Sequence, residues 1–516
     1  MLLLATAILS ASVHLAGLVD VPAEPAGPVP TVGVVAVRSV PLEGDRVGRA
    51  VGGDGARPVV DDLGDCRSLR EHPEGSDLPA GEGSSESSAA GATTGSPTDD
   101  SAPGGPGDDP RVLPCLSQLG RASSGSLTRF ADSFDPVGDD ASRVSSALVA
   151  GTSAAGTADW WAGLDPSRRL GLVAALPGVV GQLEGVPYAV RDQANRLFLT
   201  DVREALHERD DTPDEADDDD RRAAMLAQVQ AALLDRSAGD ADRELVTLDT
   251  VLPGRAAVSV GHLDTADDVT VLVPGMFFTV RGQMVDWTET AGQLLDEQRS
   301  WTYLLARSDP APLDSVAVVA WMGYRTPDLT NVYTLDLAER GAQRLEEAVG
   351  GLDASRASHA PRVTVVAHSY GSTTATLALS SGRTTVDSLV LLGSPGSVVP
   401  TADDLDVAGH DVYAAAGSFD PVAGSGYFGA DPGTAAFGAV KLHTGGGDDT
   451  VTGRVLAAAL GHNDYLRPGT ESMRSLALIA LGRGDLADGD ERNPGEPAPE
   501  GPELALVRPQ DVYLRD

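Results

Sequence analysis

The sequence is poor in basic residues for its length. It has 38 lysines and arginines against 76 aspartates and glutamates in 516 residues, which gives a formal net charge of −38. A chain of this charge repels the phosphates of nucleic acids and the surfaces of anionic lipids. We therefore expect no nucleic-acid function and attribute most of the charge to solvated acidic surfaces and tails.

Long apolar runs are also scarce. Beyond residues 2–18, no stretch approaches the roughly 20 uninterrupted apolar residues that span a bilayer, which excludes a multi-pass membrane protein. Residues 2–18 are uncharged and mostly apolar but lack a basic n-region. Residues 1–22 are therefore a candidate signal or anchor segment, and the sequence leaves exported and cytoplasmic locations equally open. Membrane association is expected only through this N-terminal segment.

Cysteine is nearly absent. The two cysteines, Cys66 and Cys115, flank a stretch rich in Gly, Ser and Pro, and their spacing does not match a zinc site. They can form a disulfide if the chain is exported, and two free thiols are the equal alternative. We expect neither a metal ion nor an organic cofactor.

The first 150 residues contain a segment that is almost free of large apolar side chains. In residues 73–110, too little apolar surface is available to offset the entropy of ordering, so this segment is expected to be disordered. We interpret residues 23–150 as an N-terminal extension with a helix near residues 141–150. At the other end, residues 486–516 are again rich in Pro, Gly and acidic residues, and we expect a tail.

Helical spacing dominates residues 160–240, which we interpret as a helical lead-in or lid. The acidic run at residues 210–220 is expected to be a loop within it. Residues 241–485 then show short β-branched runs that alternate with helical stretches, notably Leu335–Val349 and Ser372–Leu379.

This alternation predicts an α/β domain with a doubly wound, mainly parallel sheet. Several runs are apolar throughout, as in strands that are buried on both faces. The first strands follow one another without helices, so that edge of the sheet is expected to be antiparallel. The expected strands are Leu245–Leu248, Ala256–Val260, Val269–Val273, Val316–Ala320, Val363–Ala367, Ser388–Leu392, Val412–Ala416 and Val440–Leu442.

The most informative local pattern is VTVVAHSYGS at Val363–Ser372. An apolar strand leads into Ala-His-Ser-Tyr-Gly and then into a helix, which matches the Gly-x-Ser-x-Gly nucleophile elbow with Ala367 in place of the first glycine. The turn is so tight that only small residues fit two positions before and after the nucleophile. We therefore predict that Ser369 is a nucleophile, held above the sheet in a strained conformation.

A serine hydroxyl needs a base, and in this arrangement the chain order is Ser, then Asp or Glu, then His. Among the histidines after Ser369, His462 fits best because it lies in a loop before the last helical stretch. His443, directly after a strand, is the alternative. His410 precedes a strand, where a base is not expected.

The acid is expected just after a strand that follows the nucleophile. Asp420 comes after the run Val412–Ala416 and is the best candidate. Asp448, Asp449 and Asp464 are the alternatives.

An oxyanion hole needs two backbone donors. One is the N–H after the nucleophile, at Tyr370, and the other lies on a loop after an early strand. Here that loop contains Met276, whose N–H we predict as the second donor, with the N–H of Phe277 as the alternative. Phe277 and Phe278 are candidate substrate-binding residues. Like Met276, Trp321 and Tyr324, they can equally belong to the core.

Three blocks of sequence together resemble a known family. They are Trp160–Asn195, Thr265–Met276 and Ala367–Gly371, and they resemble an α/β-hydrolase family that is found mostly in actinobacteria and is catalogued as a domain of unknown function. The resemblance covers about residues 160–482, helical lead-in included, and nothing in residues 1–150 takes part. It implies the α/β-hydrolase fold and a Ser/Asp/His site, but no particular substrate.

These observations predict a serine hydrolase that cleaves an ester or related acyl bond of a small molecule through an acyl-enzyme. Ser369 would attack, His462 would take its proton, and Asp420 would orient the imidazole. An acyltransferase with the same site is one alternative, and a non-catalytic binding protein that retains the fold is another. The sequence does not define the oligomeric state.

Overall fold

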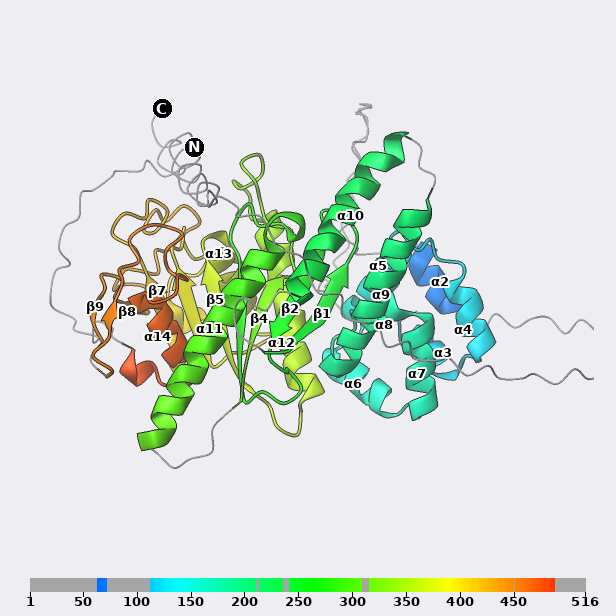
Figure 1. Cartoon of the computed structure of the whole chain (residues 1–516), viewed down its shortest axis with the longest axis horizontal. Coiled ribbons are helices and arrows are strands. Elements are labelled where there is room, and N and C mark those ends of the chain that lie inside the picture. Colours follow the sequence, from blue (N-terminus) through cyan, green and yellow to red (C-terminus); the bar gives the residue numbers. More distant parts are fainter. Residues whose placement is uncertain are drawn as a thin grey trace, which may run out of the picture.

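The structure is a computed structural model with a helical part beside an α/β part (Figure 1). The candidate signal segment, the segment expected to be disordered and all but the start of the expected tail lie outside the residues it describes. Within the described residues, no helix is both long and apolar enough to cross a membrane. The described residues are 63–71, 112–209, 213–234, 241–308, 315–449 and 451–487.

An eight-stranded sheet forms the centre of the α/β part, in the order β1-β2-β4-β3-β5-β6-β7-β8. β2 runs antiparallel to both of its neighbours, and all other pairs are parallel. The predicted doubly wound, mainly parallel sheet with an antiparallel edge is therefore confirmed. The strands are β1 (Arg243–Asp249), β2 (Arg255–Val260), β3 (Asp268–Val273), β4 (Val316–Met322), β5 (Arg362–His368), β6 (Ser388–Leu392), β7 (Val412–Ala415) and β8 (Val440–Leu442).

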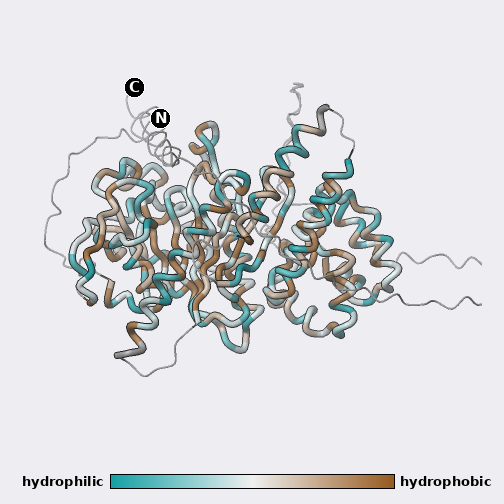
Figure 2. The backbone as a smooth tube through the Cα atoms, viewed as in Figure 1, coloured by the Kyte–Doolittle hydropathy of each residue, from teal (hydrophilic) through white to brown (hydrophobic). Residues whose placement is uncertain are grey.

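Both faces of this sheet are buried. Successive residues of a strand point to opposite faces, and in β4 they alternate between two hydrophobic clusters, with Val318 and Ala320 in one and Val319 and Trp321 in the other. This two-sided burial explains why the strands read as continuous apolar runs. In Figure 2 the brown, hydrophobic stretches concentrate in the interior of the α/β part.

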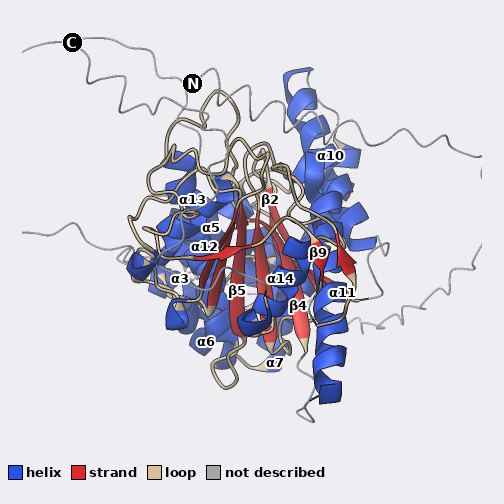
Figure 3. Cartoon of the chain, turned by 90° about the vertical axis from the view of Figure 1, so that its left-hand side faces the viewer, coloured by secondary structure: helices blue, strands red, loops and turns tan. Residues whose placement is uncertain are grey.

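Helices cover both faces of the sheet, and most of the loops gather at one end of the strands (Figure 3). α11 (Val280–Ser308) and α14 (Glu471–Ala480) pack on one face, and α12 (Asp336–Ser355) and α13 (Tyr370–Leu379) on the other. The sequence pattern located α12 and α13 but did not single out α11. Short elements complete this part: β9 (Gly447–Asp448), β10 (Val455–Leu456), η1 (Ala402–Asp404), η2 (Ala408–His410) and η3 (Gly484–Leu486).

The helical part precedes β1 and shares its core with the sheet. Buried residues of the early helices, such as Leu69 and Leu148, belong to the same hydrophobic cluster as strand residues such as Val258. Its helices are α2 (Gly64–Glu71), α3 (Val112–Arg121), α4 (Ser124–Ala131), α5 (Asp140–Gly151), α6 (Ala154–Ala162), α7 (Pro166–Ala175), α8 (Pro177–Val180), α9 (Tyr188–Glu208) and α10 (Pro213–Leu234).

The expectation of a loop at residues 210–220 is wrong for most of that run. Helix α10 begins at Pro213 and includes the acidic residues that follow. A proline is well tolerated in the first turn of a helix, and carboxylates near the N-terminus interact favourably with the helix dipole. The acidic composition therefore favours a helix start here.

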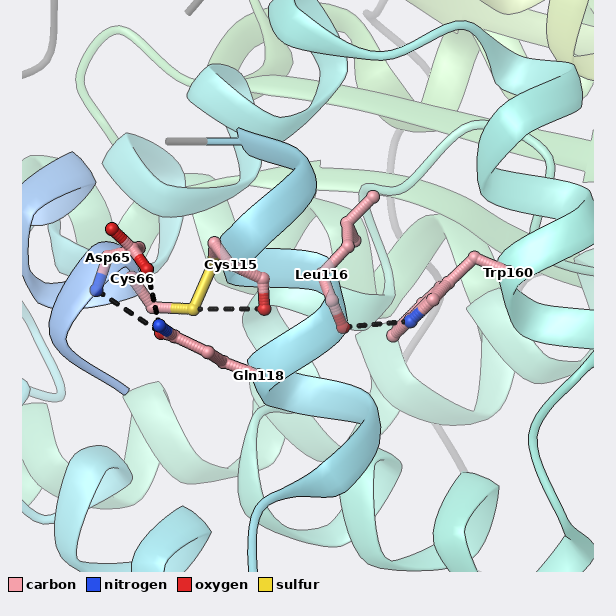
Figure 4. Close-up of a disulfide and its surroundings, with 6 residues drawn as sticks. All are labelled: Asp65, Cys66, Cys115, Leu116, Gln118 and Trp160. Carbon is pink, nitrogen blue, oxygen red and sulfur yellow. Dashed lines mark hydrogen bonds between the residues drawn. A yellow bond between two sulfur atoms is a disulfide. The ribbon is translucent and has the colours of Figure 1, made fainter. Parts of the chain in front are cut away.

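A disulfide joins the first two described helices. Cys66 of α2 is bonded to Cys115 of α3, and both side chains are fully buried. Nearby, the amide N–H of Asp65 donates to Gln118, and the indole of Trp160 donates to the carbonyl of Leu116 at 2.9 Å (Figure 4). Of the two alternatives that the sequence left open for the cysteines, the structure contains the disulfide.

Candidate active site

Ser369 occupies the turn between β5 and α13. Its backbone has φ 56° and ψ −128°, a conformation that costs energy for any residue except glycine. The amide of Ser369 donates to the carbonyl of Leu392 at 2.9 Å, and its side chain is almost fully buried. The local geometry is therefore the strained strand-to-helix turn that the sequence predicted for this serine.

Small residues leave room for this turn. A Cβ on Gly371 would lie 2.5 Å from the carbonyl oxygen of Pro274 and 2.7 Å from that of Val273. A Cβ on Gly275 would lie 2.6 Å from Cβ of Ser369. The loop after β3 therefore packs directly against the elbow, and glycine is required on both sides of the contact.

The structure brings Ser369, His462 and Asp420 together. Nε2 of His462 lies 2.9 Å from Oγ of Ser369, and Nδ1 lies 2.9 Å from each carboxylate oxygen of Asp420. Because a carboxylate accepts, Nδ1 carries the proton and Nε2 is free to accept from the serine hydroxyl. The imidazole is thus in the tautomer that a general base needs.

Asp420 is held ionised by its hydrogen bonds. Its carboxylate accepts from His462, from the hydroxyl of Tyr465 at 2.6 Å and from the amides of Val422 at 2.8 Å and Ala423 at 3.2 Å. Burial favours the neutral acid, but the hydrogen bond and charge of His462, aided by Tyr465 and Val422, outweigh it and lower the pKa of Asp420 to about 2. The carboxylate therefore remains negative throughout the neutral range.

The other histidines have different surroundings. His443 is exposed, directly after β8. His410 is also exposed and lies 3.4 Å from the carboxylate of Asp403. Neither hydrogen-bonds to Ser369.

The alternative acids are engaged elsewhere or exposed. Asp449 forms a buried ion pair with Arg474 at 2.7 Å. Asp464 accepts from the amide of Gly461 at 2.7 Å, and Asp448 is exposed in β9. His462 bonds to none of them.

Two of the expected oxyanion donors lie at the elbow. Tyr370 begins α13 directly after Ser369, and Met276 follows Gly275, which contacts Ser369. The amide of Phe277 instead donates to the carbonyl of Pro327 at 2.9 Å, which favours Met276 over Phe277 as the second donor.

Two buried side chains at the site were not singled out from the sequence. His368, directly before Ser369, donates from Nε2 to the carbonyl of His462 at 2.7 Å, and its ring centroid lies 4.6 Å from that of His462. Burial, together with the charge of His462, lowers the pKa of His368 to about 3, so this ring is neutral. Tyr465 donates to Asp420 and accepts from the amide of Gly417 at 2.7 Å.

For both His368 and Tyr465, the signal in the sequence was a position close to a predicted catalytic residue. His368 precedes the nucleophile, and Tyr465 lies three positions after the base. Spacing alone does not separate a residue that supports the base from an ordinary core aromatic.

Two cavities lie beside the loop after β3, and the smaller one also borders the elbow through His368. One of ≈ 420 Å³ is lined by Phe277 and Phe278, and another of ≈ 210 Å³ is lined by Phe278 and His368. Phe278 therefore forms part of both walls. Trp321 is buried against Tyr324, whose hydroxyl donates to the carbonyl of Pro274 at 2.7 Å. These two aromatics thus support the loop after β3 as part of the core, although Tyr324 also touches the larger cavity.

No group of three or more His, Cys, Asp or Glu side chains that could hold a metal ion is found in the part of the chain that the structure describes.

Comparison with known proteins agrees with the fold. A family model described as alpha/beta hydrolase matches residues 249–430. The uncharacterized protein Rv2079 of Mycobacterium tuberculosis is 30% identical over 389 residues, which are 66% of this chain and 57% of that protein. The uncharacterized protein Mb0988c of Mycobacterium bovis is 35% identical over 193 residues, 36% of this chain and 71% of that protein.

Solved structures of hydrolases are also similar, at a low level. A dienelactone hydrolase from Anabaena variabilis is 14% identical, with a TM-score of 0.27 over 47% of this chain and 95% of that one. An esterase from Pyrobaculum calidifontis is 12% identical, with a TM-score of 0.29 over 55% of this chain and 97% of that one. These values add nothing to the fold that the strand order defines. By its sheet, the family match and its mycobacterial relatives, the chain belongs to the alpha/beta hydrolase family.

Proposed function

We propose that this protein is a serine hydrolase that cleaves an ester or related acyl bond of a small molecule. The observation that carries the proposal is the continuous hydrogen-bonded line from Ser369 through His462 to Asp420, with both contacts of the imidazole at 2.9 Å. Such a line activates a serine hydroxyl, which is a weak nucleophile by itself.

In the proposed reaction, Oγ of Ser369 attacks the carbonyl carbon and Nε2 of His462 takes its proton. The imidazolium is stabilised by ionised Asp420. The amides of Tyr370 and Met276 donate to the oxyanion, a contribution of about 3 kcal/mol for each donor. His462 then returns the proton to the leaving alcohol, and a water molecule hydrolyses the acyl-enzyme by the same steps.

The strained backbone conformation of Ser369 also supports this assignment. The positive φ of Ser369 holds the hydroxyl at the end of β5, next to the loop that contains Met276. A structural serine gains nothing from such a conformation, which costs about 1–3 kcal/mol. Nucleophile and oxyanion donors are thereby positioned before the substrate binds.

The test is hydrolysis of a series of p-nitrophenyl acyl esters of increasing chain length. We expect the native chain to hydrolyse at least one ester, with a drop in kcat of about 10⁴-fold or more in Ser369→Ala and in His462→Gln. Ser300→Ala, an exposed serine on α11, is the matched control and keeps full activity.

Adding an alcohol acceptor separates hydrolysis from acyl transfer. If product forms mainly as the new ester, the same site is an acyltransferase. If the native chain hydrolyses no ester and Ser369→Ala behaves identically, the proposed chemistry is wrong and a binding role takes its place.

A further inference from the structure

The larger cavity, beside the loop after β3, has an unusual charge for this chain. Its lining contains three arginines, Arg221, Arg281 and Arg325, and two aspartates, Asp218 and Asp328, so the wall carries one excess positive charge. The whole chain has a formal net charge of −38. The excess positive charge in the wall of this cavity therefore contrasts with the strongly negative charge of the whole chain.

The charged groups of this cavity are not all equivalent. Arg221 pairs with Asp218 within α10 at 3.0 Å. Asp328 accepts hydrogen bonds from the amide and hydroxyl of Thr330, in its own turn. Neither Arg281 nor Arg325 forms an ion pair with a described carboxylate. Both guanidinium groups are exposed, and the charge of Arg325 helps to lower the pKa of Asp328 in the same wall.

The rest of the wall is largely apolar. Phe277, Phe278 and Val280 come from the loop after β3 and the start of α11, and Met322 comes from the end of β4. Asp218 and Arg221 come from helix α10, which packs against α11 (Figure 1). The cavity of ≈ 420 Å³ combines an apolar body with cationic groups, as suits a small amphipathic ligand.

The loop after β3 links this cavity to the nucleophile, and Ser369 itself is not part of the lining. Phe277 is two residues beyond Gly275, so their Cα atoms lie within roughly 8 Å of each other. A Cβ on Gly275 would lie 2.6 Å from Cβ of Ser369. A substrate bound at the elbow can therefore extend past Phe277 toward Arg281 and Arg325.

We propose that this cavity binds an anionic end of the substrate, so that the preferred esters carry a carboxylate on an apolar body. Arginine suits this role because its planar guanidinium donates two parallel hydrogen bonds to a carboxylate. The proposal rests on the serine hydrolase function argued above and narrows its substrate class. It assigns Arg281 and Arg325 to substrate binding rather than to chemistry.

The experiment compares esters that differ in one charge. Mono-p-nitrophenyl glutarate and p-nitrophenyl valerate place a carboxylate or a methyl group at the end of the acyl chain. 4-Acetoxybenzoate and its methyl ester differ in the leaving phenol, which carries a carboxylate in the first and a neutral methyl ester in the second. We expect a preference in kcat/KM of about tenfold for the anionic ester of one pair, since that is the effect of one charge-assisted hydrogen bond.

The double variant Arg281→Gln/Arg325→Gln is expected to lose this preference through a higher KM for the anionic ester. The matched control is Arg299→Gln, an exposed arginine on the same helix α11 but about 27 Å from Arg281 along its axis. It should keep the preference. Raising the salt concentration should weaken the preference in the native chain, because exposed charges are screened.

Binding to Ser369→Ala, measured by calorimetry with the same two ester pairs, tests the cavity without turnover. Tighter binding of an anionic ester that disappears in the arginine double variant supports the inference even if no ester is hydrolysed. If the native chain hydrolyses esters through Ser369 but treats anionic and neutral esters alike, the inference is overturned and the hydrolase function stands. The inference is equally overturned if the double variant keeps the preference.

Discussion

Removing the hydroxyl of Tyr465 tests how Asp420 is held in place. The ring of Tyr465 is 1% exposed, and its hydroxyl donates to Asp420 at 2.6 Å while accepting from the amide of Gly417 at 2.7 Å. In Tyr465→Phe the ring still fills its space, but both hydrogen bonds are lost. Asp420 keeps its bonds to His462 and to the amides of Val422 and Ala423.

The cost follows from these contacts. A hydrogen bond to a charged group contributes about 1.5–3 kcal/mol, and a buried amide left without an acceptor costs about 1–3 kcal/mol. We therefore expect Tyr465→Phe to lower the free energy of unfolding by about 3 kcal/mol. Because Tyr465 helps to lower the pKa of Asp420, the variant should raise that pKa.

For catalysis, we expect kcat to fall by about tenfold with KM little changed, since the tyrosine acts on Asp420 and not on substrate. The assays are urea denaturation followed by circular dichroism, and p-nitrophenyl ester hydrolysis. Tyr333→Phe, at a tyrosine that is 51% exposed, is the matched control and should match the native chain in both. If Tyr465→Phe has native stability and native kcat, the hydroxyl of Tyr465 does not hold Asp420 in place.

Three further predictions concern pH, the elbow and the disulfide. The pKa of His368 is lowered to about 3, so the unfolded chain binds this proton first and stability falls as the pH drops below about 6.5. The loss attributable to this group is about 2 kcal/mol between pH 7 and pH 5, and His368→Gln should remove it in urea titrations at the two pH values. Gly371→Ala should lower kcat by more than about 100-fold, because the added methyl group displaces the loop after β3, and its circular dichroism should show whether the fold survives. Replacing Cys66 and Cys115 by serine removes a disulfide between residues 49 positions apart and should lower the free energy of unfolding by about 4 kcal/mol. A reductant should destabilise the native chain but not this double variant.

The sheet was predictable because its strands are buried on both faces. A run such as Val316–Ala320 has no polar position and is too short for a core helix, so only a buried strand fits it. Helix α11 was not singled out, although buried residues such as Met284, Trp287 and Ala291 recur at the three- and four-residue spacing of a helix over its 29 positions. Its place on the sheet depends on contacts with β4 and α14, which sequence spacing does not reveal.

Composition alone also led to the wrong prediction for the acidic run in α10. Asp217 to Asp220 suggest a solvated loop by composition, yet Arg222 pairs with Asp219 at 2.9 Å within the helix. Pairs of opposite charge three or four positions apart stabilise helices. Local charge pairing and the helix dipole outweigh composition here.

At the site, the chain order of Ser369, Asp420 and His462 could be predicted because the strand that precedes each loop was recognisable. The roles of His368 and Tyr465 could not, because they depend on distances between loops that lie 94 and 45 residues apart in the sequence. The arginines of the larger cavity come from two helices and the loop after β4, and nothing in their spacing brings them together.

The proposed function depends above all on Ser369 being an activated nucleophile. We would treat the native chain with a fluorophosphonate probe and locate the adduct by mass spectrometry of the digested protein. We expect one adduct, on Ser369, that is absent from Ser369→Ala and forms much more slowly in His462→Gln, whereas Ser300→Ala is labelled like the native chain. If the folded native chain is not labelled, or Ser369→Ala is labelled equally, Ser369 is not an activated nucleophile.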